Sequence, residues 1–217
     1  MFIGHFGAGF VGKKFSKSAS LGTYFMAAQW IDLIWPILLL LGIEKVEIEP
    51  GISSVTPLDF YYYPYTHSLF GVLVWALLFG FVYYLLKKNS RVAIILGLLV
   101  LSHWFLDLLV HIPDLPIFPG EGLKVGLGLW NSFAATIILE GLIFGLGVYL
   151  YYKVTKAKNK TGKYSLIGLI TFLILIYALN LTGPPPDSVE AIGIVGNAQW
   201  LIILCAYWID RNREGYD

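Results

Sequence analysis

The strongest constraint on this chain is a series of long apolar segments joined by short connectors. A helix needs about 20 apolar residues to cross the ~30 Å hydrocarbon core of a bilayer. Only 13% of the residues are charged, whereas a soluble domain has about 25%. We predict six membrane spans, at residues 21–43, 64–86, 92–112, 127–152, 164–182 and 192–210.

Each predicted span is expected to be helical, because a backbone in lipid must satisfy its own hydrogen bonds. No repeat and no second domain interrupts the chain, so residues 1–217 are predicted to form one all-α transmembrane domain. The first apolar run is longer than the apolar region of a signal peptide and lacks an obvious cleavage site. We therefore expect it to remain as an anchor.

The basic residues predict the orientation of the spans. If the N-terminus is cytoplasmic, six crossings place 13 of the 15 Lys and Arg residues on the cytoplasmic side, with Lys45 and Lys124 outside. Cytoplasmic connectors are enriched in Lys and Arg in this way, and an odd number of spans would destroy the bias. We predict that both termini are cytoplasmic. The net charge of +1 gives no indication of a nucleic-acid-binding surface.

Residues 2–12 are apolar but too short to cross a bilayer. They are expected to form either an amphipathic helix on the membrane surface or a re-entrant half-helix. Small residues spaced four apart let helices approach closely, and the sequence has two such sets: Gly4, Ala8 and Gly12, and Gly141 with Gly145.

Residues 7–12 also match the G-x-G-x-x-G pattern of dinucleotide-binding proteins. That pattern binds a dinucleotide only between a β-strand and a helix. Only six residues precede it here, and the acid that follows at the expected spacing, Asp32, lies inside a predicted span. We reject a dinucleotide site.

Three acids lie inside apolar spans, at Asp32, Asp107 and Glu140. An ionised carboxylate at the bilayer centre costs about 2.5–3.5 kcal/mol on insertion scales. Such groups usually face the interior of the helix bundle and find a partner there. The three acids therefore predict a polar site inside the bundle.

The four histidines are candidate partners for these acids, and each lies beside or inside an apolar segment: His5, His67, His103 and His111. His103, Asp107 and His111 follow an H-x3-D-x3-H spacing, which places each adjacent pair on one helix face. His103 and His111 are two turns apart, about 12 Å along the axis. One of them is therefore expected to lie outside the ligand set of a shared ion, or to serve a second metal.

Imidazole and carboxylate together suit Zn²⁺ or another divalent cation. We predict a metal site in the outer half of the bundle, with His67, His103, Asp107 and His5 as candidate ligands. Asp32 is predicted as a fourth ligand or general base, and Glu140 and His111 as proton-handling or supporting groups. The single cysteine, Cys205, excludes a metal site built from several cysteines.

Several short motifs resemble those of the YdjM-like and YbcI-like family, bacterial inner-membrane proteins described as metal-dependent hydrolases. They are His5-Phe6-Gly7-Ala8-Gly9, Asp32, Thr66-His67-Ser68, and His103 with Asp107. The resemblance covers about residues 1–112. The family often has a Pro-Asp-x-Asp cluster where this chain has Asp32 alone, which puts a dinuclear site in doubt. The resemblance implies metal-dependent hydrolysis and a location in the cytoplasmic membrane of a prokaryote.

From these features we expect a membrane hydrolase, which would use water activated by a bound divalent metal, most simply zinc. A site within the bilayer favours a lipid or other amphiphile carrying an ester, amide or phosphoester. The alternatives are a proton-coupled or small-solute transporter that uses the intramembrane acids as relays, and a structural subunit in which the His–Asp pairs only fix helix packing.

Overall fold

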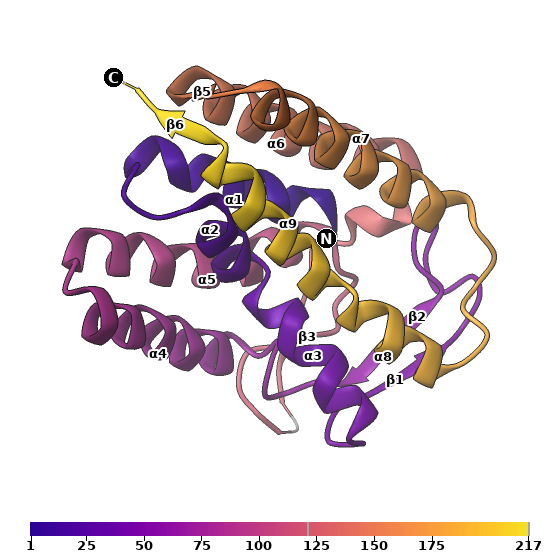
Figure 1. The fold of residues 1–217 in the computed structure, drawn as a ribbon. Coiled ribbons are helices and arrows are strands. Elements are labelled where there is room, and N and C mark those ends of the chain that lie inside the picture. The colour runs from indigo at the N-terminus through magenta and orange to yellow at the C-terminus, as the bar shows by residue number, and fades with distance from the viewer. Residues whose placement is uncertain (121, 217) are drawn as a thin grey trace.

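The computed structural model describes residues 1–120 and 122–216, which form a mostly helical bundle (Figure 1). The helices are α1 (Ile3–Phe15), α2 (Leu21–Ala28), α3 (Trp30–Leu40), α4 (Leu69–Lys87), α5 (Ser90–Val110), α6 (Phe133–Val154), α7 (Lys160–Thr182), α8 (Val189–Asn197) and α9 (Gln199–Arg211). The strands pair in antiparallel hairpins or ribbons: β1 (Lys45–Ile48) with β2 (Leu58–Tyr62), β3 (Leu115–Pro116) with β4 (Lys124–Val125), and β5 (Thr155–Ala157) with β6 (Arg213–Gly215).

Within the part of the chain that the structure describes, five helical segments are long and apolar enough to cross a membrane. They are α4, α5, α6, α7 and the combined α8–α9 segment, Val189–Arg211. The pair α2 and α3 makes a sixth if it counts as one span, although the two helices are bent by 56°. The helical class and the number of apolar segments therefore agree with the sequence analysis, and the membrane orientation of the chain stays a prediction.

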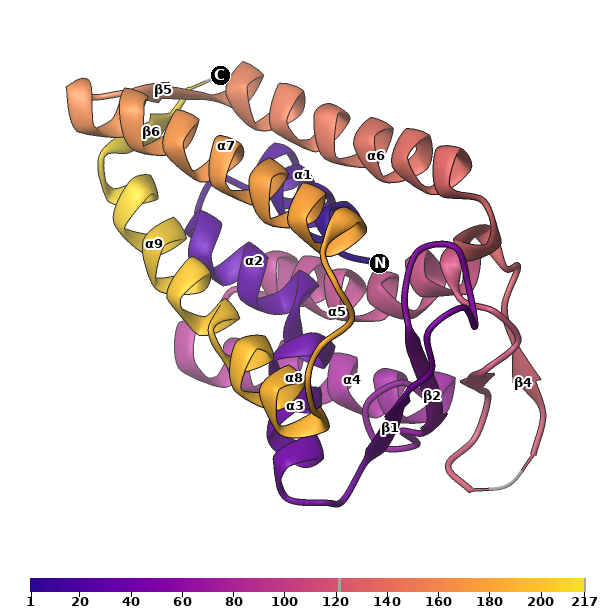
Figure 2. The same ribbon diagram turned by 90° about the vertical axis from the view of Figure 1, so that its right-hand side faces the viewer.

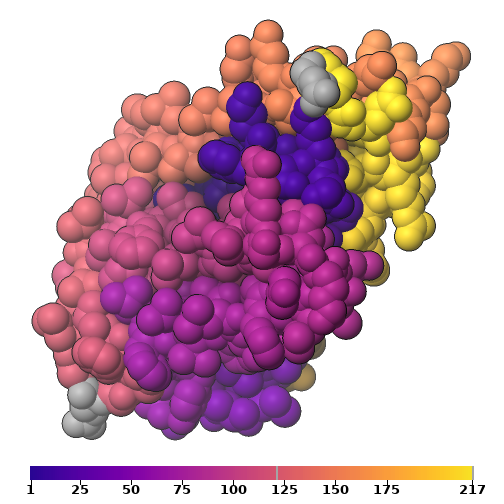
Figure 3. Space-filling model, turned by 90° about the vertical axis from the view of Figure 1, so that its left-hand side faces the viewer, coloured from indigo at the N-terminus to yellow at the C-terminus, as the bar shows by residue number. Residues whose placement is uncertain are grey.

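Helix α1 lies inside the bundle, packed chiefly against α6, α2 and α5 (Figure 2). Phe6 and Phe10 are completely buried, and the ring of Phe10 contacts those of Phe25, Phe144 and Tyr151. On the face shown in Figure 3, the indigo N-terminal segment is visible between the magenta region below it and the orange and yellow regions above and beside it. This burial favours the re-entrant helix over a helix on the membrane surface.

The close approach of α1 and α6 depends on glycines. A Cβ on Gly7 would lie 2.7 Å from the carbonyl oxygen of Ile143, and a Cβ on Gly147 would collide with the backbone of Gly7. Small residues at helix crossings permit such backbone contact. The predicted packing role of Gly141 and Gly145 is not seen, since a Cβ at either would meet nothing within 4 Å.

The connectors gather at two ends of the bundle. One end carries β5 and β6, the α4–α5 connector and the end of α1, where Arg91 binds the Phe15 carbonyl and Lys158 binds that of Arg211. The opposite end carries β1, β2, β3 and β4. The segments that contain the 13 basic residues assigned to the cytoplasm therefore share the β5–β6 end, as the six-span arrangement requires.

The bend in the first span occurs at Gln29, between α2 and α3. A helix leaves its last carbonyl groups without partners inside the helix. The bend therefore frees the carbonyl of Ala28 for another donor, and it places Asp32 in the first turn of α3. The positive end of a helix dipole stabilises a carboxylate at that position.

Candidate metal centre

Four of the residues singled out in the sequence converge on one place: Asp32 from α3, His67 just before α4, and His103 and Asp107 from α5. Nε2 of His103 lies 3.2 Å from Oδ2 of Asp107 and 3.5 Å from Oδ1 of Asp32. Nε2 of His67 lies 3.5 Å from Oδ1 of Asp32 and 3.9 Å from Oδ2 of Asp107. Two imidazole nitrogens and two carboxylate oxygens therefore face a common point.

The other nitrogen of His103 is already engaged. Its Nδ1 donates a hydrogen bond to the Ala28 carbonyl, at 2.9 Å. This bond uses the carbonyl that the bend in the first span leaves free. It places the lone pair of the neutral imidazole on Nε2, the atom that faces the carboxylates. A backbone carbonyl on the far nitrogen is the usual support of a metal-binding histidine.

His67 is held in a similar way. Its Nδ1 lies 2.7 Å from Oγ1 of Thr66, and that hydroxyl donates to Oε2 of Glu44 at 2.6 Å. Since the threonine proton goes to Glu44, the hydroxyl oxygen accepts the proton on Nδ1 of His67. Glu44 is fixed in turn by the backbone N–H groups of Tyr65 and Thr66. The Nε2 lone pair of His67 therefore also points toward the carboxylates.

These four donors fit a divalent cation. Nε2 of His103 is buried and makes no hydrogen bond, although it lies between two carboxylate oxygens. A tetrahedral ion with bonds of about 2.0–2.2 Å separates its ligand atoms by about 3.4 Å. The four separations between a histidine nitrogen and a carboxylate oxygen run from 3.2 to 3.9 Å. The orphaned nitrogen and the spacing both agree with an ion at this point.

His5 belongs to the same cluster but contacts the other oxygen of Asp107. Its Nε2 lies 3.0 Å from Oδ1, and its ring stacks on that of His103 with the centroids 3.6 Å apart. The α-amino group of Met1 lies 2.6 Å from the same oxygen. His5, His103 and Asp107 form a second possible metal-binding group that overlaps the first, Asp32, His67 and His103.

Glu140, the third intramembrane acid, caps α1. Its Oε2 accepts hydrogen bonds from the backbone N–H groups of Phe2, at 2.8 Å, and Gly4, at 3.2 Å. The first N–H groups of a helix have no partner inside it and favour a negative charge. Glu140 therefore fixes the start of α1, and with it the position of His5.

His111 lies apart from the four converging donors. Its Nδ1 is 2.9 Å from Oδ1 of Asp114, which also accepts a hydrogen bond from the Tyr63 hydroxyl at 3.2 Å. Burial raises the pKa of Tyr63 well above its usual value, and the charge of Asp114 adds to the effect. Tyr63 therefore remains a proton donor to Asp114. The ring of Trp130 covers His111, with the centroids 4.0 Å apart.

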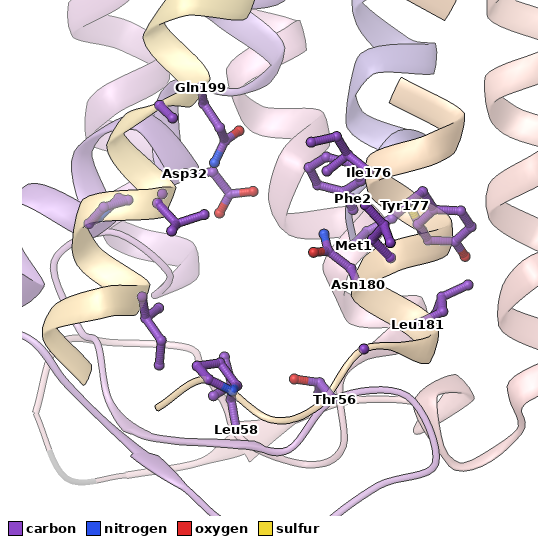
Figure 4. A pocket seen from close by; sticks show the side chains of 18 of the residues that line it. Met1, Phe2, Asp32, Thr56, Leu58, Ile176, Tyr177, Asn180, Leu181 and Gln199 are labelled. Atoms are coloured by element: carbon purple, nitrogen blue, oxygen red, sulfur yellow. The ribbon is translucent and has the colours of Figure 1, made fainter. Parts of the chain in front are cut away.

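The cluster opens on a cavity of about 1440 Å³, which we call the central cavity. Its lining includes Asp32, His67, Asp107, His111 and Glu140. In Figure 4, Asp32 and Gln199 lie on one wall, and Phe2, Tyr177 and Asn180 lie on the opposite wall. The side chain of Asp32 is 22% exposed, whereas those of His67, His103 and Asp107 are at most 5% exposed. Asp32 is thus the cluster residue most open to a ligand.

The structure brings together four of the predicted site residues, Asp32, His67, His103 and Asp107, with His5 beside them. Glu44 and Asp114, which support this cluster and His111, lie in predicted connectors and are not among the predicted site residues. Thr66 was noted only as part of a motif. The signal that could have found Glu44 and Asp114 is their position, since each is an acid within five residues of a predicted span boundary.

Comparison of the chain with protein families, curated proteins and solved structures found no match. The resemblance described above therefore stays a prediction, and the functional argument rests on the cluster and the cavity.

Proposed function

We propose that the chain is a membrane-embedded, metal-dependent hydrolase that acts on a lipid or another amphiphile. The observation that carries the proposal is the convergence of two imidazole nitrogens and two carboxylate oxygens on the wall of a large cavity. The other nitrogen of each imidazole is already hydrogen-bonded: Nδ1 of His103 to the Ala28 carbonyl, and Nδ1 of His67 to the Thr66 hydroxyl. A cation is the partner that satisfies all four donors at once.

In this proposal His67, His103 and Asp107 hold the cation, most simply Zn²⁺, and His5 adds a ligand or supports Asp107. A divalent cation supplies Lewis-acid activation of water for hydrolysis. Asp32, which faces the cavity, serves either as a fourth ligand or as the general base that takes a proton from the attacking water (Figure 4). The new bond joins the water oxygen to the carbonyl carbon or phosphorus, the bond from that atom to the leaving oxygen or nitrogen breaks, and the leaving atom gains a proton. His111 lines the cavity, and we assign it as the group that donates this proton to the leaving atom.

Metal analysis of the purified protein tests the proposal. We expect about one divalent ion per chain, and its loss in His103→Ala because that change removes a ligand from a buried site. The matched control is His111→Ala, which removes another buried histidine of the cavity but should keep the ion. Wild-type protein without metal, or equal loss in both variants, would overturn the metal site.

A proton-coupled transporter is the second candidate, because Asp32, Asp107 and Glu140 all line the one cavity. Counterflow in proteoliposomes separates the two functions. A transporter moves solute when metal is absent, whereas a hydrolase releases product and moves nothing. We favour the hydrolase, since Glu140 is tied to the start of α1 by two backbone N–H groups.

The proposal also sets a location. With both termini cytoplasmic, the cluster lies toward the outer face of the membrane, because the β1–β2 end is then outside. We place the protein in the cytoplasmic membrane of a prokaryote, where the substrate would be a membrane lipid or a small amphiphile.

A further inference from the structure

The central cavity extends far beyond the metal cluster. Along α7 its lining runs from Tyr177, near the cluster, to Thr161 at the β5–β6 end. These residues are 16 positions apart, which is about 24 Å along a helix. The facing wall is α9, where the lining continues from Gln199 to Trp208. Figure 2 shows α7 and α9 diverging from the β5–β6 end toward α8.

The wall of the cavity between α7 and α9 is mostly apolar. We call it the α7–α9 groove and define it by Leu169, Phe172 and Ile176 on α7 and Ile202, Cys205 and Trp208 on α9. Polar side chains lie at the cluster end, where Gln199 and Asn180 face each other across the cavity (Figure 4), and Thr161, Tyr164 and Ser165 line the far end of α7. Oε1 of Gln199 is buried without a hydrogen-bond partner. The cavity therefore offers a polar end at the cluster and a long, mostly apolar wall beyond it.

The cavity is open at its side. Leu179, Val195 and Leu201 line it, and yet they are 65%, 70% and 67% exposed. These three residues belong to apolar segments long enough to cross a membrane, so their exposed faces would meet lipid. A ligand could therefore pass between the bilayer and the cavity without crossing water.

From this shape we infer that the α7–α9 groove binds one long acyl chain of an outer-leaflet lipid, with the polar part of that lipid beside the metal cluster. The assignment of the polar part rests on the proposed function. An extended chain advances about 1.2 Å per bond, so 24 Å accommodates about 20 bonds. The groove therefore matches the common long-chain lipids and is deeper than a short-chain ester needs.

Glycine 168 offers a way to shorten the groove. It lines the cavity on α7, and a Cβ there would meet nothing within 4 Å. It lies nine residues, or about 14 Å, from Tyr177. Gly168→Phe should therefore fill the groove beyond about 11 chain bonds without disturbing the helix packing.

Gly145→Phe on α6 is the matched control. A Cβ at Gly145 also meets nothing within 4 Å, and Gly145 does not appear in the cavity lining. It lies nine residues before the end of α6, and Gly168 lies eight residues after the start of α7, both at the β5–β6 end. The two substitutions thus add the same ring at a similar depth in the bundle. Gly168→Phe places it inside the groove, and Gly145→Phe places it outside.

The test uses photocrosslinking of the full chain in nanodiscs after chelation of metal, so that no probe is cleaved. The long probe is palmitoyl lysophosphatidylcholine with a diazirine near its methyl end, and the short probe carries an octanoyl chain. Mass spectrometry should find long-probe adducts at 161–168 and 205–208. Gly168→Phe should lower those adducts by roughly tenfold or more, while Gly145→Phe should change them less than about twofold. The short probe should label near Phe172 in all three proteins.

Long-probe adducts that survive Gly168→Phe, or that spread evenly over the exposed face of α4, would overturn the groove and indicate ordinary surrounding lipid. Because the protein is metal-free in this experiment, the result does not depend on hydrolysis. If the metal analysis finds no ion in the purified protein but the probe labels the groove, the acyl-chain site stands and only the proposed enzyme is overturned.

Discussion

At the scale of single residues, the geometry of the cluster depends on the hydrogen bond that each imidazole makes through its Nδ1 atom. His103 and His67 meet the carboxylates through Nε2, and each is oriented by a bond on Nδ1. The two supports differ in kind, since one is a backbone carbonyl and the other is the Thr66 hydroxyl backed by Glu44. Only the second support can be removed by substitution.

Thr66→Val removes that hydroxyl while keeping the shape of the side chain. His67 then loses the acceptor for its Nδ1 proton, and the Glu44 carboxylate loses a donor. Loss of such a supporting bond lowers metal affinity by about 10–100-fold. Competition with a chelator of known affinity measures the change.

Thr66→Ser is the control, because it keeps the hydroxyl and should bind metal within a few-fold of the wild-type protein. Equal affinity in Thr66→Val and Thr66→Ser would show that the Glu44–Thr66–His67 chain does not support a metal ligand.

The residues that the sequence identified and those it missed differ in one respect. Asp32, Asp107 and the histidines are anomalous in apolar segments, so composition alone draws attention to them. Glu44 and Asp114 lie in predicted connectors and Thr66 lies at the very start of a predicted span, where polar residues are expected. Their burial arises only because the connectors fold back over the site, which no local pattern records.

At the scale of elements, α1 is the part that the sequence left open. It is 13 residues long and too short to span, but it occupies the interior because glycines let it approach α6. The four-residue spacing predicted that Gly4, Ala8 and Gly12 let another helix approach closely. Gly12 does pack closely against Tyr24 of α2, whereas the backbone contact with α6 is made by Gly7 and Gly147. Spacing identifies a helix face with small residues but does not say which neighbour meets it.

Gly147→Ala tests this contact. The added methyl group would collide with the backbone of Gly7, so α1 must move away from α6. Overpacking of this kind costs about 1–3 kcal/mol. We expect a lower thermal unfolding midpoint, and weaker metal binding because α1 carries His5.

Gly145→Ala lies on the same helix and adds the same methyl group where nothing stands within 4 Å. Its unfolding midpoint should stay close to that of the wild-type protein. If both variants unfold alike, the α1–α6 contact does not have the stated role.

The bend between α2 and α3 was also not predicted. Residues 21–43 are predicted as one span, because the run is long and mostly apolar and contains no glycine near the break. The bend brings Asp32 to a helix start and frees the Ala28 carbonyl for His103. Tertiary contacts thus determine a feature on which the site depends.

At the scale of the whole molecule, the connectors with 13 basic residues lie at the end that carries β5 and β6. The apolar lengths of the segments were sufficient to predict the bundle, because lipid allows a chain few other folds. The orientation in the membrane depends on the charge bias alone.

Labelling of single cysteines measures that orientation in a chain whose own Cys205 is replaced by Ser. Glu49 and Lys160 are exposed and lie in connectors at opposite ends of the bundle. In intact bacterial cells, a membrane-impermeant maleimide should label Glu49→Cys, and Lys160→Cys should react only after permeabilisation. The reverse pattern would place the metal cluster on the cytoplasmic side.

The side opening of the cavity has a practical consequence for anyone who isolates the protein. Leu179, Val195 and Leu201 present apolar cavity wall to the surroundings, so the alkyl tail of a solubilising detergent can enter where a lipid chain would lie. Detergents would then act as competitive inhibitors, and more strongly as their tails lengthen. Turnover that is weak in micelles should recover on transfer to a lipid bilayer.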